Sequence, residues 1–483
     1  MDSDISPPSR HEVPGKIGSS LDCTDANIPD IPQKKRSLRY SLRFPLCCLL
    51  LFSNGFHDAS PGALIPYIQA HYNISYLLVS LVFLSLGGGF VIAVTVAERL
   101  DGWVGRRWVL VGASLCLGVG ALVVGILGEV DGPWAVVVVT FLLFGLAQSL
   151  VLAQVNAYCG GLENNTAMGY VHGNSILRFD ASIMDTDRLW LISGSYGIGA
   201  TISPLLATFL ISKGLLWWRY YFIILAVFIS NSIFSFFIFR DGSPSLHTIN
   251  SETPTIVETK PKMKQNTNEL ALPTATIKGN SSNLHTILSP ATLATSLFIF
   301  SYQGAEVSNG GWVPTFLIEA RSGDPKKMGY VATGFWCGLT LGRFTFPHIF
   351  SYLHRLRPGS QKKAHDASGH TATYVIISLC LLLEIFTWQI PSVIVNAMLV
   401  GIFGWLLGPM YPSAMLVLLG KVDPEHHVSV LSVVSAIGSA GGGLAPFTTG
   451  VLATKFGAWV LYPVSLGLLV VMEVAWWVLV REK

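Results

Sequence analysis

Charged residues are scarce in this chain, in which Asp, Glu, Lys and Arg make up only 12% of the 483 residues. A soluble globular protein usually carries about 25% charged residues, so a soluble fold of this length would have too little charge to cover its surface. Hydrophobic residues make up 51%, and apolar runs of about 20 residues, enough to cross a bilayer, recur along the chain. These runs do not alternate as β-barrel strands do. We therefore expect an all-α integral membrane protein, because lipid-facing backbone must satisfy its own hydrogen bonds.

Signatures of several other protein classes are also missing. The net charge of +3 is too small to indicate a nucleic-acid partner. The 7 cysteines show no CxxC or His/Cys spacing, so we expect neither a metal site nor a cofactor. No nucleophile–base pair or phosphate-binding loop is recognisable, which argues against an enzyme. The polar N-terminus lacks the apolar core of a cleavable signal.

The apolar spans fall into two sets on either side of a polar stretch. We expect 12 transmembrane helices in two homologous six-helix bundles. The N-terminal bundle is predicted at 39–240 and the C-terminal bundle at 289–483, with a disordered cytoplasmic tail at 1–38 and a flexible cytoplasmic linker at 241–288. The spans are predicted at roughly 43–70, 76–98, 108–128, 134–160, 195–213, 218–239, 289–319, 328–352, 371–390, 391–419, 426–453 and 457–480.

The stretch 174–194 fits this pattern poorly, because charged residues such as Arg178 and Asp187 directly precede a Gly-rich span. One hypothesis is that these residues are translated from an unspliced intron. The alternative is a real cytoplasmic loop helix. Sequencing of the transcript across this junction decides between them, since a mature mRNA that retains the segment would contradict the intron hypothesis.

The distribution of Lys and Arg predicts the orientation of the chain in the membrane. One set of loops holds only Lys213, Arg219, Arg321, Lys326, Lys327 and Lys455. All other Lys and Arg lie in the tail, the linker, the remaining loops and the C-terminus, except Arg343, which lies within a span. We therefore expect both termini to be cytoplasmic, and Asn73 of Asn73-Ile-Ser75 to face outward as a glycosylation candidate. We expect a monomer in the lipid bilayer of the plasma membrane rather than of the vacuole or another organelle.

An internal repeat supports the division into two bundles. In Asp58–Pro66 and in Glu306–Pro314, an acid is followed by Ser at +2, Gly at +4 and Pro at +8. The spacing of Gly and Pro in Gly199–Pro204 recurs in Gly441–Pro446. Matches at equivalent places in each half indicate duplication. Two homologous bundles around a central site are the arrangement of secondary transporters whose halves rock.

Ionisable groups inside apolar spans are costly, which makes each one a candidate functional residue. Asp58 and Glu306 are the strongest candidates for proton coupling, because they occupy matching positions in the two halves. A low-dielectric site favours the neutral form of a carboxyl and so lets it take up and release a proton. His57 is a further candidate, although it points about 100° away from Asp58 on a helix. A structural hydrogen-bond role is the alternative for all three.

Polar and aromatic side chains near these acids are typical of sites for hydroxylated solutes. The substrate-binding candidates are Asn54, Gln303, Asn309, Trp312, Gln148, Gln154 and Asn156. The alternative for the amides is hydrogen bonding between helices. Glu384 and Glu473 rank lower, because they lie in the ninth and twelfth spans. We expect Arg343 to anchor the cytoplasmic end of its span, with substrate contact as the alternative.

Motifs in the sequence resemble those of the major facilitator superfamily. Glu98, Arg99, Asp101, Gly105 and Arg106 follow the second span and resemble that family's cytoplasmic gating loop, in a degenerate form. Three further segments resemble a fungal branch of the fucose:proton symporter-like family, namely 54–66, 195–204 and 304–314. This resemblance covers roughly 40–480 and implies that Asp58 is the acid of the first helix. That family usually has a second acid four residues before an Asn, where this chain has Leu152 before Asn156.

Three functions compete on this evidence. The leading one is a secondary active transporter that moves protons and a small polar solute, such as a hexose, by alternating access. The second is efflux of a fungal metabolite or drug by the same fold, which the missing acid at Leu152 and the many Trp and Phe residues favour. The third is a non-transporting membrane sensor, against which the short tail argues because it carries no recognisable partner motif.

Overall fold

The computed structural model describes residues 38–160, 183–240, 286–355, 362–423 and 426–482. Every regular element in these ranges is a helix, as the sequence predicts. The expected tail and nearly all of the expected linker lie outside the described residues. The same holds for 174–182, so the intron hypothesis stays a prediction.

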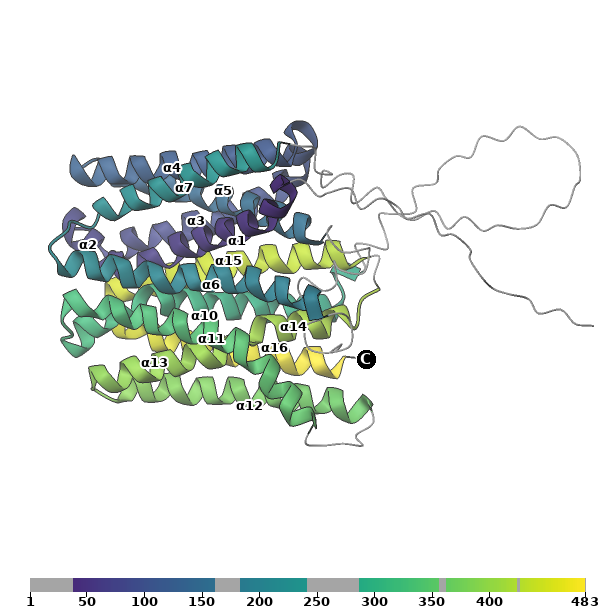
Figure 1. Cartoon of the computed structure of the whole chain (residues 1–483). Helices are drawn as coiled ribbons and strands as arrows, with labels where there is room; N and C mark the ends of the chain where they lie inside the picture. The colour runs from purple at the N-terminus through teal and green to yellow at the C-terminus, as the bar shows by residue number, and fades with distance from the viewer. Residues whose placement is uncertain (1–37, 161–182, 241–285, 356–361, 424–425, 483) are drawn as a thin grey trace, which may run out of the picture. The chain divides into compact units, whose positions relative to one another are not determined.

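The helices before residue 241 form one group, which we call the N-terminal group. It consists of α1 (Leu38–Asp58), α2 (Ser60–Tyr72), α3 (Tyr76–Val104), α4 (Arg106–Glu129), α5 (Trp134–Gly160), α6 (Ile183–Ser212) and α7 (Arg219–Ile238). Most of these helices run side by side along one direction (Figure 1). The span expected at 43–70 is two helices, α1 and α2, because Pro61 occupies the first turn of a new helix and a proline favours that position.

The helices after residue 285 form the C-terminal group. It consists of α10 (Pro290–Arg321), α11 (Pro325–Arg355), α12 (Lys362–Gln389), α13 (Val393–Leu407), α14 (Met410–Leu419), α15 (His427–Phe456), η3 (Ala458–Val460) and α16 (Leu461–Arg481). Helix α10 begins close to the predicted residue 289, since Ser289 caps it by accepting a hydrogen bond from the backbone N–H of Thr292. The span expected at 391–419 is divided between α13 and α14 at Gly408 and Pro409.

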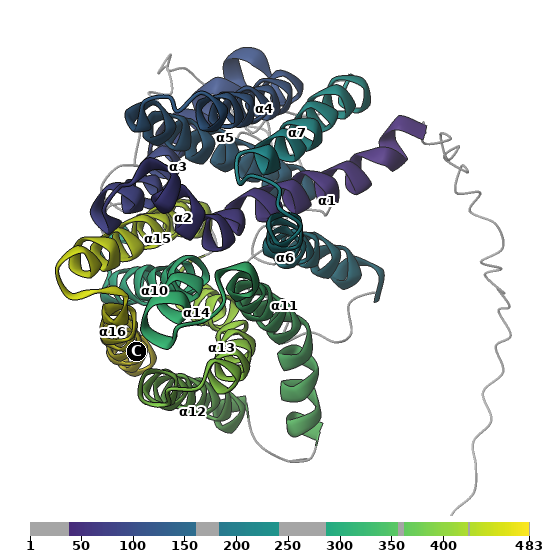
Figure 2. The same ribbon diagram turned by 90° about the vertical axis from the view of Figure 1, so that its left-hand side faces the viewer.

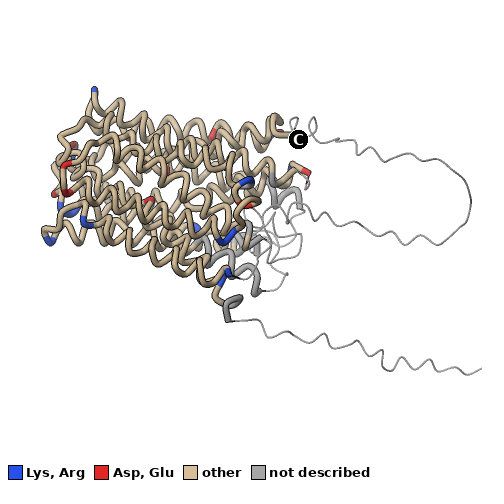
Figure 3. The backbone as a smooth tube through the Cα atoms, turned by 90° about the horizontal axis from the view of Figure 1, so that it is seen from above, with Lys and Arg blue, Asp and Glu red and all other residues tan. Residues whose placement is uncertain are grey.

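Nine candidate membrane spans occur among the described residues, judged by length and hydropathy. They are Tyr76–Ala97, Arg106–Glu129, Trp134–Asn156, Gly194–Ser212, Arg219–Ile238, Gly369–Gln389, Val393–Leu419, Ser429–Phe456 and Ala458–Arg481. Large apolar side chains such as Phe209 and Val474 are exposed on them, as a lipid-facing surface requires. Among the described residues, Lys, Arg, Asp and Glu occur mostly near the two ends of the helices (Figure 3). The chain is thus a multi-pass integral membrane protein.

Helices α1, α10 and α11 are absent from these nine, although the sequence predicts spans there. They are the helices that carry Asp58, Glu306 and Arg343. Helix α1 is interrupted by the start of α2, and α11 also carries Lys326 and Lys327 near its beginning. The polar residues that lower hydropathy are therefore concentrated on helices in the middle of the protein.

The two groups contact each other through matching helices. Helix α3 of the first group packs along α15 of the second, and α11 of the second packs along α6 of the first. Helix α2 also contacts α10 and α11. Viewed along the helices, α3, α2, α1 and α6 face α15, α10 and α11, while α4 and α12 lie far from this interface (Figure 2).

The repeat found in the sequence corresponds to a repeated helix crossing. A Cβ atom on Gly199 would clash with the backbone carbonyl of Phe52, and one on Gly441 would clash with that of Phe300. Phe52 and Phe300 each lie six residues before the acid of their repeat. Gly199 on α6 and Gly441 on α15 therefore have the same role in the two halves. The first lets α6 approach α1 as closely as the second lets α15 approach α10.

Candidate functional site

Asp58 is the last residue of α1, and its carboxylate faces the interface between the two groups. The phenol of Tyr196 on α6 donates a hydrogen bond of 3.0 Å to its Oδ2. Its Oδ1 lies 3.6 Å from Nδ1 of His57, and the side chain is 16% exposed. Tyr196 reaches Asp58 because Gly55 on α1 has no side chain to keep the backbone of Tyr196 away. The N-terminal group thus pairs its acid with a phenol.

Glu306 lies in the middle of α10 and is paired with a cation. Nη2 of Arg343 lies 3.5 Å from its Oε1 and donates a second hydrogen bond, of 3.3 Å, to the phenol of Tyr302. Arg343 stands in the interior of α11, which continues to Arg355. The expectation that it anchors the cytoplasmic end of its span is wrong, because the guanidinium turns inward to the carboxylate of Glu306.

The two acids and their partners form one group of side chains between the halves. The carboxyl of Asp58 interacts electrostatically with that of Glu306. Tyr196 interacts with both acids and with Arg343, and Tyr411 of α14 interacts with Glu306 and Arg343. We call these six residues the central cluster: Asp58, Tyr196, Tyr302, Glu306, Arg343 and Tyr411. The structure therefore brings together residues from α1, α6, α10, α11 and α14.

His57 lies inside the N-terminal group rather than at the interface. Its ring is fully buried and meets the ring of Phe144 edge-on, with 4.3 Å between the centroids. Nε2 of Gln148 lies 3.0 Å from its Nδ1, and Asn54 donates a hydrogen bond to the backbone carbonyl of Gln148. These candidates hold α1 against α5. The structure does not place them in the central cluster.

Asn309 and Trp312 also point away from the central cluster. The amide of Asn309 donates hydrogen bonds to Glu384 at 3.0 Å and to Ser465 at 2.9 Å, which joins α10 to α12 and α16. The indole of Trp312 donates to the backbone carbonyl of Pro446 at 2.9 Å. Glu384, which the sequence analysis ranked low, is thus a buried member of a hydrogen-bonded network in the C-terminal group.

The remaining amide candidates lie apart from one another. Gln303 stands on α10 beside Gly438 of α15. Gln154 is buried on α5, where its Oε1 accepts a hydrogen bond of 3.1 Å from Nε of Arg106. Asn156 is half-buried near the end of α5. No amide candidate belongs to the central cluster as defined.

The expected gating loop is mostly helical in the structure. Glu98, Arg99 and Asp101 lie in the last turns of α3, which ends only before Gly105, where φ is +80°. Helix α3 ends there because Gly105 adopts a positive φ, which glycine tolerates and other residues rarely adopt. Asp101 and Arg106 are both buried. Two of the charges proposed for gating, Asp101 and Arg106, therefore lie inside the protein at the junction of α3 and α4, whereas Arg99 is exposed.

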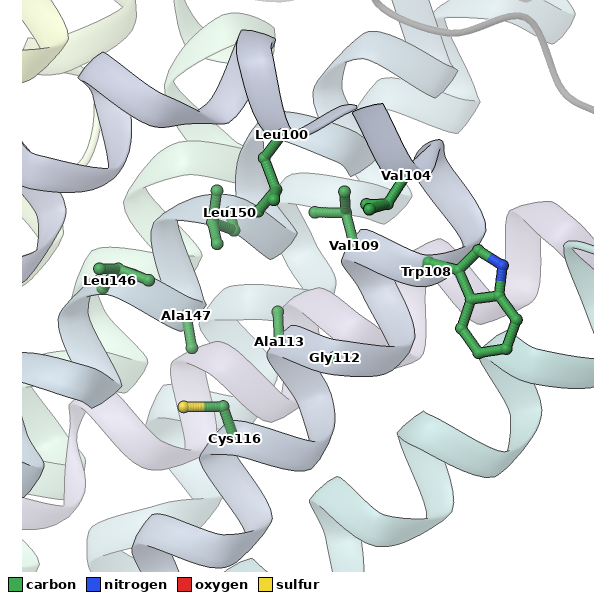
Figure 4. A pocket seen from close by; sticks show the side chains of 10 residues that line it. All are labelled: Leu100, Val104, Trp108, Val109, Gly112, Ala113, Cys116, Leu146, Ala147 and Leu150. Carbon is green, nitrogen blue, oxygen red and sulfur yellow. The ribbon is translucent and has the colours of Figure 1, made fainter. Parts of the chain in front are cut away.

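Hollows also lie outside the central cluster among the described residues, and two of them bear on function. The first, of about 270 Å³, is lined by Leu100, Val104, Trp108, Val109, Gly112, Ala113, Cys116, Leu146, Ala147 and Leu150 (Figure 4). This almost wholly apolar lining on α3, α4 and α5 suits lipid hydrocarbon better than a polar solute. The second, of about 320 Å³, lies at the ends of α2 and α10 and includes Asn73 and Glu319. Asn73 is exposed, and its glycosylation stays a prediction.

Among solved structures, the chain resembles several membrane transporters. Against the nucleoside transporter NupG the TM-score is 0.58, with 15% identity and coverage of 93% of this chain and 100% of that one. Against the fucose:proton symporter FucP of Escherichia coli it is 0.57, with 13% identity and coverage of 92% and 100%. Against a bacterial homologue of the human lysosomal transporter Spinster it is 0.60, with 13% identity and coverage of 92% and 95%. The chain has the fold of these major facilitator transporters.

A fungal protein is similar in sequence as well. The chain is 27% identical over 423 residues to "Bypass of stop codon protein 6" of Saccharomyces cerevisiae, which covers 85% of this chain and 77% of that protein. No protein-family model matches the chain.

Proposed function

We propose that this chain is a secondary active transporter that moves protons together with a small polar organic solute by alternating access. It would cross the membrane 12 times in two homologous six-helix bundles with both termini cytoplasmic. The observation that carries this proposal is that Asp58, through Tyr196 on α6, and Glu306, through Arg343 on α11, both lie where α6 packs against α11. These acids occupy equivalent positions in the internal repeat and interact across the interface of the two halves, where a rocking transporter holds its substrate.

The partners of the two acids support a division of roles. Arg343 compensates the charge of Glu306, whereas Asp58 accepts a hydrogen bond from a neutral phenol. A buried charge is costly unless it is paired, so a proton is the simplest compensation for Asp58. Asp58 is accordingly our candidate for the proton-binding residue. The fucose:proton symporter whose fold the chain shares supports a hydroxylated, sugar-like solute.

Contacts at one end of the helices support alternating access. At the end opposite the C-terminus, the phenol of Tyr67 donates to the backbone carbonyl of Pro325 at 2.8 Å. The backbone N–H of Leu77 donates to the hydroxyl of Thr454, also at 2.8 Å. Each bond joins the N-terminal group to the C-terminal group. Opening of this end would separate such contacts, while the helix pairs within each group stay intact.

The first experiment measures solute-evoked proton movement in cells that lack hexose transport and express the full chain. Hexoses, deoxyhexoses and the corresponding hexuronic acids are tested with wild type, Asp58→Asn and Glu306→Gln. Glu319→Gln serves as a matched control, because Glu319 lies on the same helix as Glu306 but is exposed at its end. The proposal predicts alkalinisation of the medium that Asp58→Asn abolishes and Glu319→Gln leaves intact. If no solute moves protons although the protein reaches the cell surface, the proposal of symport is contradicted and efflux becomes the leading function.

A further inference from the structure

Arg343 is the cation of the central cluster, and only part of its guanidinium is used. Both of its hydrogen bonds, to Glu306 and to Tyr302, come from Nη2. Among the described residues, its Nε and Nη1 make no hydrogen bond or ion pair. The side chain is 21% exposed, against 9% for its partner Glu306. An exposed edge of a guanidinium fork therefore lies between the halves of the protein.

A guanidinium is charged at every physiological pH, so Arg343 needs a counter-ion in every state of the transport cycle. In the described state Glu306 provides it. Glu306 is the second candidate for proton coupling, and once it has taken up a proton of its own it no longer compensates Arg343. An unpaired charge inside the membrane is costly. Asp58 could replace Glu306 only if it stayed charged, which would conflict with its own proposed protonation. The remaining source of negative charge is the solute.

We propose that the transported solute is a hydroxylated monocarboxylate, such as a sugar acid, whose carboxylate replaces Glu306 on Arg343. This inference rests on the proposed function and specifies its substrate class. A carboxylate matches the fork of a guanidinium with two parallel hydrogen bonds. The phenols of Tyr196, Tyr302 and Tyr411 lie around the same cation and provide donors and acceptors for hydroxyl groups.

The same arrangement explains why protons would accompany the solute. An anion at Arg343 lies beside the carboxyls of Glu306 and Asp58, which repel it while they are charged. The other titratable groups facing this position are the phenols of Tyr196, Tyr302 and Tyr411, which are neutral in the physiological range. A proton on either carboxyl removes its repulsion, so binding of the anion strengthens as the proton concentration rises. A single cation favours a single negative charge on the solute over a dianionic phosphate.

The test measures binding of matched acid and neutral solutes to the purified full chain by ligand-induced thermal stabilisation. The pairs are galacturonate with galactose and gluconate with sorbitol, at pH 5.5 and pH 7.5. We expect the acids to stabilise the wild type, and to do so more strongly at pH 5.5 than at pH 7.5. The neutral partners should not stabilise it at either pH. Glu306→Gln should bind the acids about 10-fold more tightly at pH 7.5, because it frees Arg343. Arg343→Gln should weaken the acids by about 10- to 100-fold.

Arg321→Gln is the matched control, since Arg321 lies at the end of α10 and donates to the backbone carbonyl of Trp388. This variant should bind the acids as the wild type does. The inference is overturned if each neutral solute binds as well as its acid, if Arg343→Gln keeps acid binding, or if neither acid binds to the wild type or to Glu306→Gln. The gain expected for Glu306→Gln keeps the test decisive even if Arg343→Gln does not fold. If a neutral hexose still evokes proton movement, the proposal of proton symport is supported and only the proposal of an anionic substrate is contradicted.

Discussion

Gly62 on α2 and Gly310 on α10 touch through their backbones, so that a Cβ on Gly62 would clash with the carbonyl oxygen of Gly310. They are the glycines at +4 in the two repeats. Equivalent residues of the two halves therefore meet each other at the interface. A side chain at Gly62 would hold the halves apart, whereas one at Gly310 would meet the ring of Trp336 within the C-terminal group.

Gly62→Ala should oppose this state without unfolding the protein. Overpacking of a tight contact costs about 1–3 kcal/mol, which shifts an equilibrium between two states by about 5- to 150-fold. We expect slower transport and greater labelling of a cysteine placed at Tyr67, measured in membranes with a membrane-impermeant thiol reagent. Gly334→Ala is the control, because no atom lies within 4 Å of its added Cβ. Unchanged labelling in Gly62→Ala would show that the contact does not govern access.

His57 should be dispensable for proton coupling, in contrast to Asp58. Its ring is buried among aromatic side chains and pairs with Gln148. It therefore reaches the central cluster only through the adjacent residue, Asp58. We expect His57→Gln to lower thermal stability but to keep solute-evoked proton movement within about 10-fold of wild type. Proton movement is measured with a pH electrode in cells at matched surface expression. Complete loss in a folded His57→Gln variant would place the imidazole on the proton path.

The network of Asn309, Glu384 and Ser465 should stabilise the C-terminal group without taking part in coupling. Glu384 is buried, and its Oε1 accepts hydrogen bonds of 3.0 Å from both partners. Asn309→Leu removes one donor from a buried carboxyl and should cost about 1–3 kcal/mol. Thermal unfolding in detergent measures this loss. Glu473→Gln is the control, since Glu473 accepts a hydrogen bond at an exposed position.

Glu384→Gln tests the same network by a different readout. The amide keeps an oxygen that can accept both hydrogen bonds, so we expect proton movement close to that of the wild type. Abolished proton movement with intact folding would instead make Glu384 a third coupling acid.

Glycosylation of Asn73 is tested by the mobility of the protein on a gel before and after treatment with peptide N-glycosidase. The sequence predicts a shift in the wild type that Asn73→Gln abolishes. Asn73 is exposed in the turn between α2 and α3, where the hydroxyl of Ser75 caps α3. A shift that persists in Asn73→Gln would assign the glycan to another residue and would require the orientation to be reconsidered.

The helices could be predicted from the sequence because they depend on local signals. Apolar runs located the helices, and polar residues such as Ser289 marked where one begins. The division of the first span into α1 and α2 was missed, since an apolar run continues across Pro61 and hydropathy alone does not register the break. The paired acids were found because duplication places Asp58 and Glu306 at matching positions.

The partners of these acids could not be predicted in the same way. Whether Asn309 faces the central cluster or the interior of its own group depends on the rotation of α10, which spacing along one helix does not define. The contact between Tyr196 and Asp58 joins residues 138 positions apart, and it depends on how closely two helices approach. Arg343 was misjudged for a related reason, since its role depends on a neighbouring helix that supplies Glu306.

The unlike partners of the two acids have an evolutionary consequence. Both halves have the same helix crossing with an acid at the equivalent position of the repeat, but one acid has the phenol of Tyr196 as its partner and the other the guanidinium of Arg343. Because the partners differ, the two acids cannot substitute for one another. In the transporter that we propose, selection could then alter solute recognition at Arg343 while leaving the proton site at Asp58 untouched.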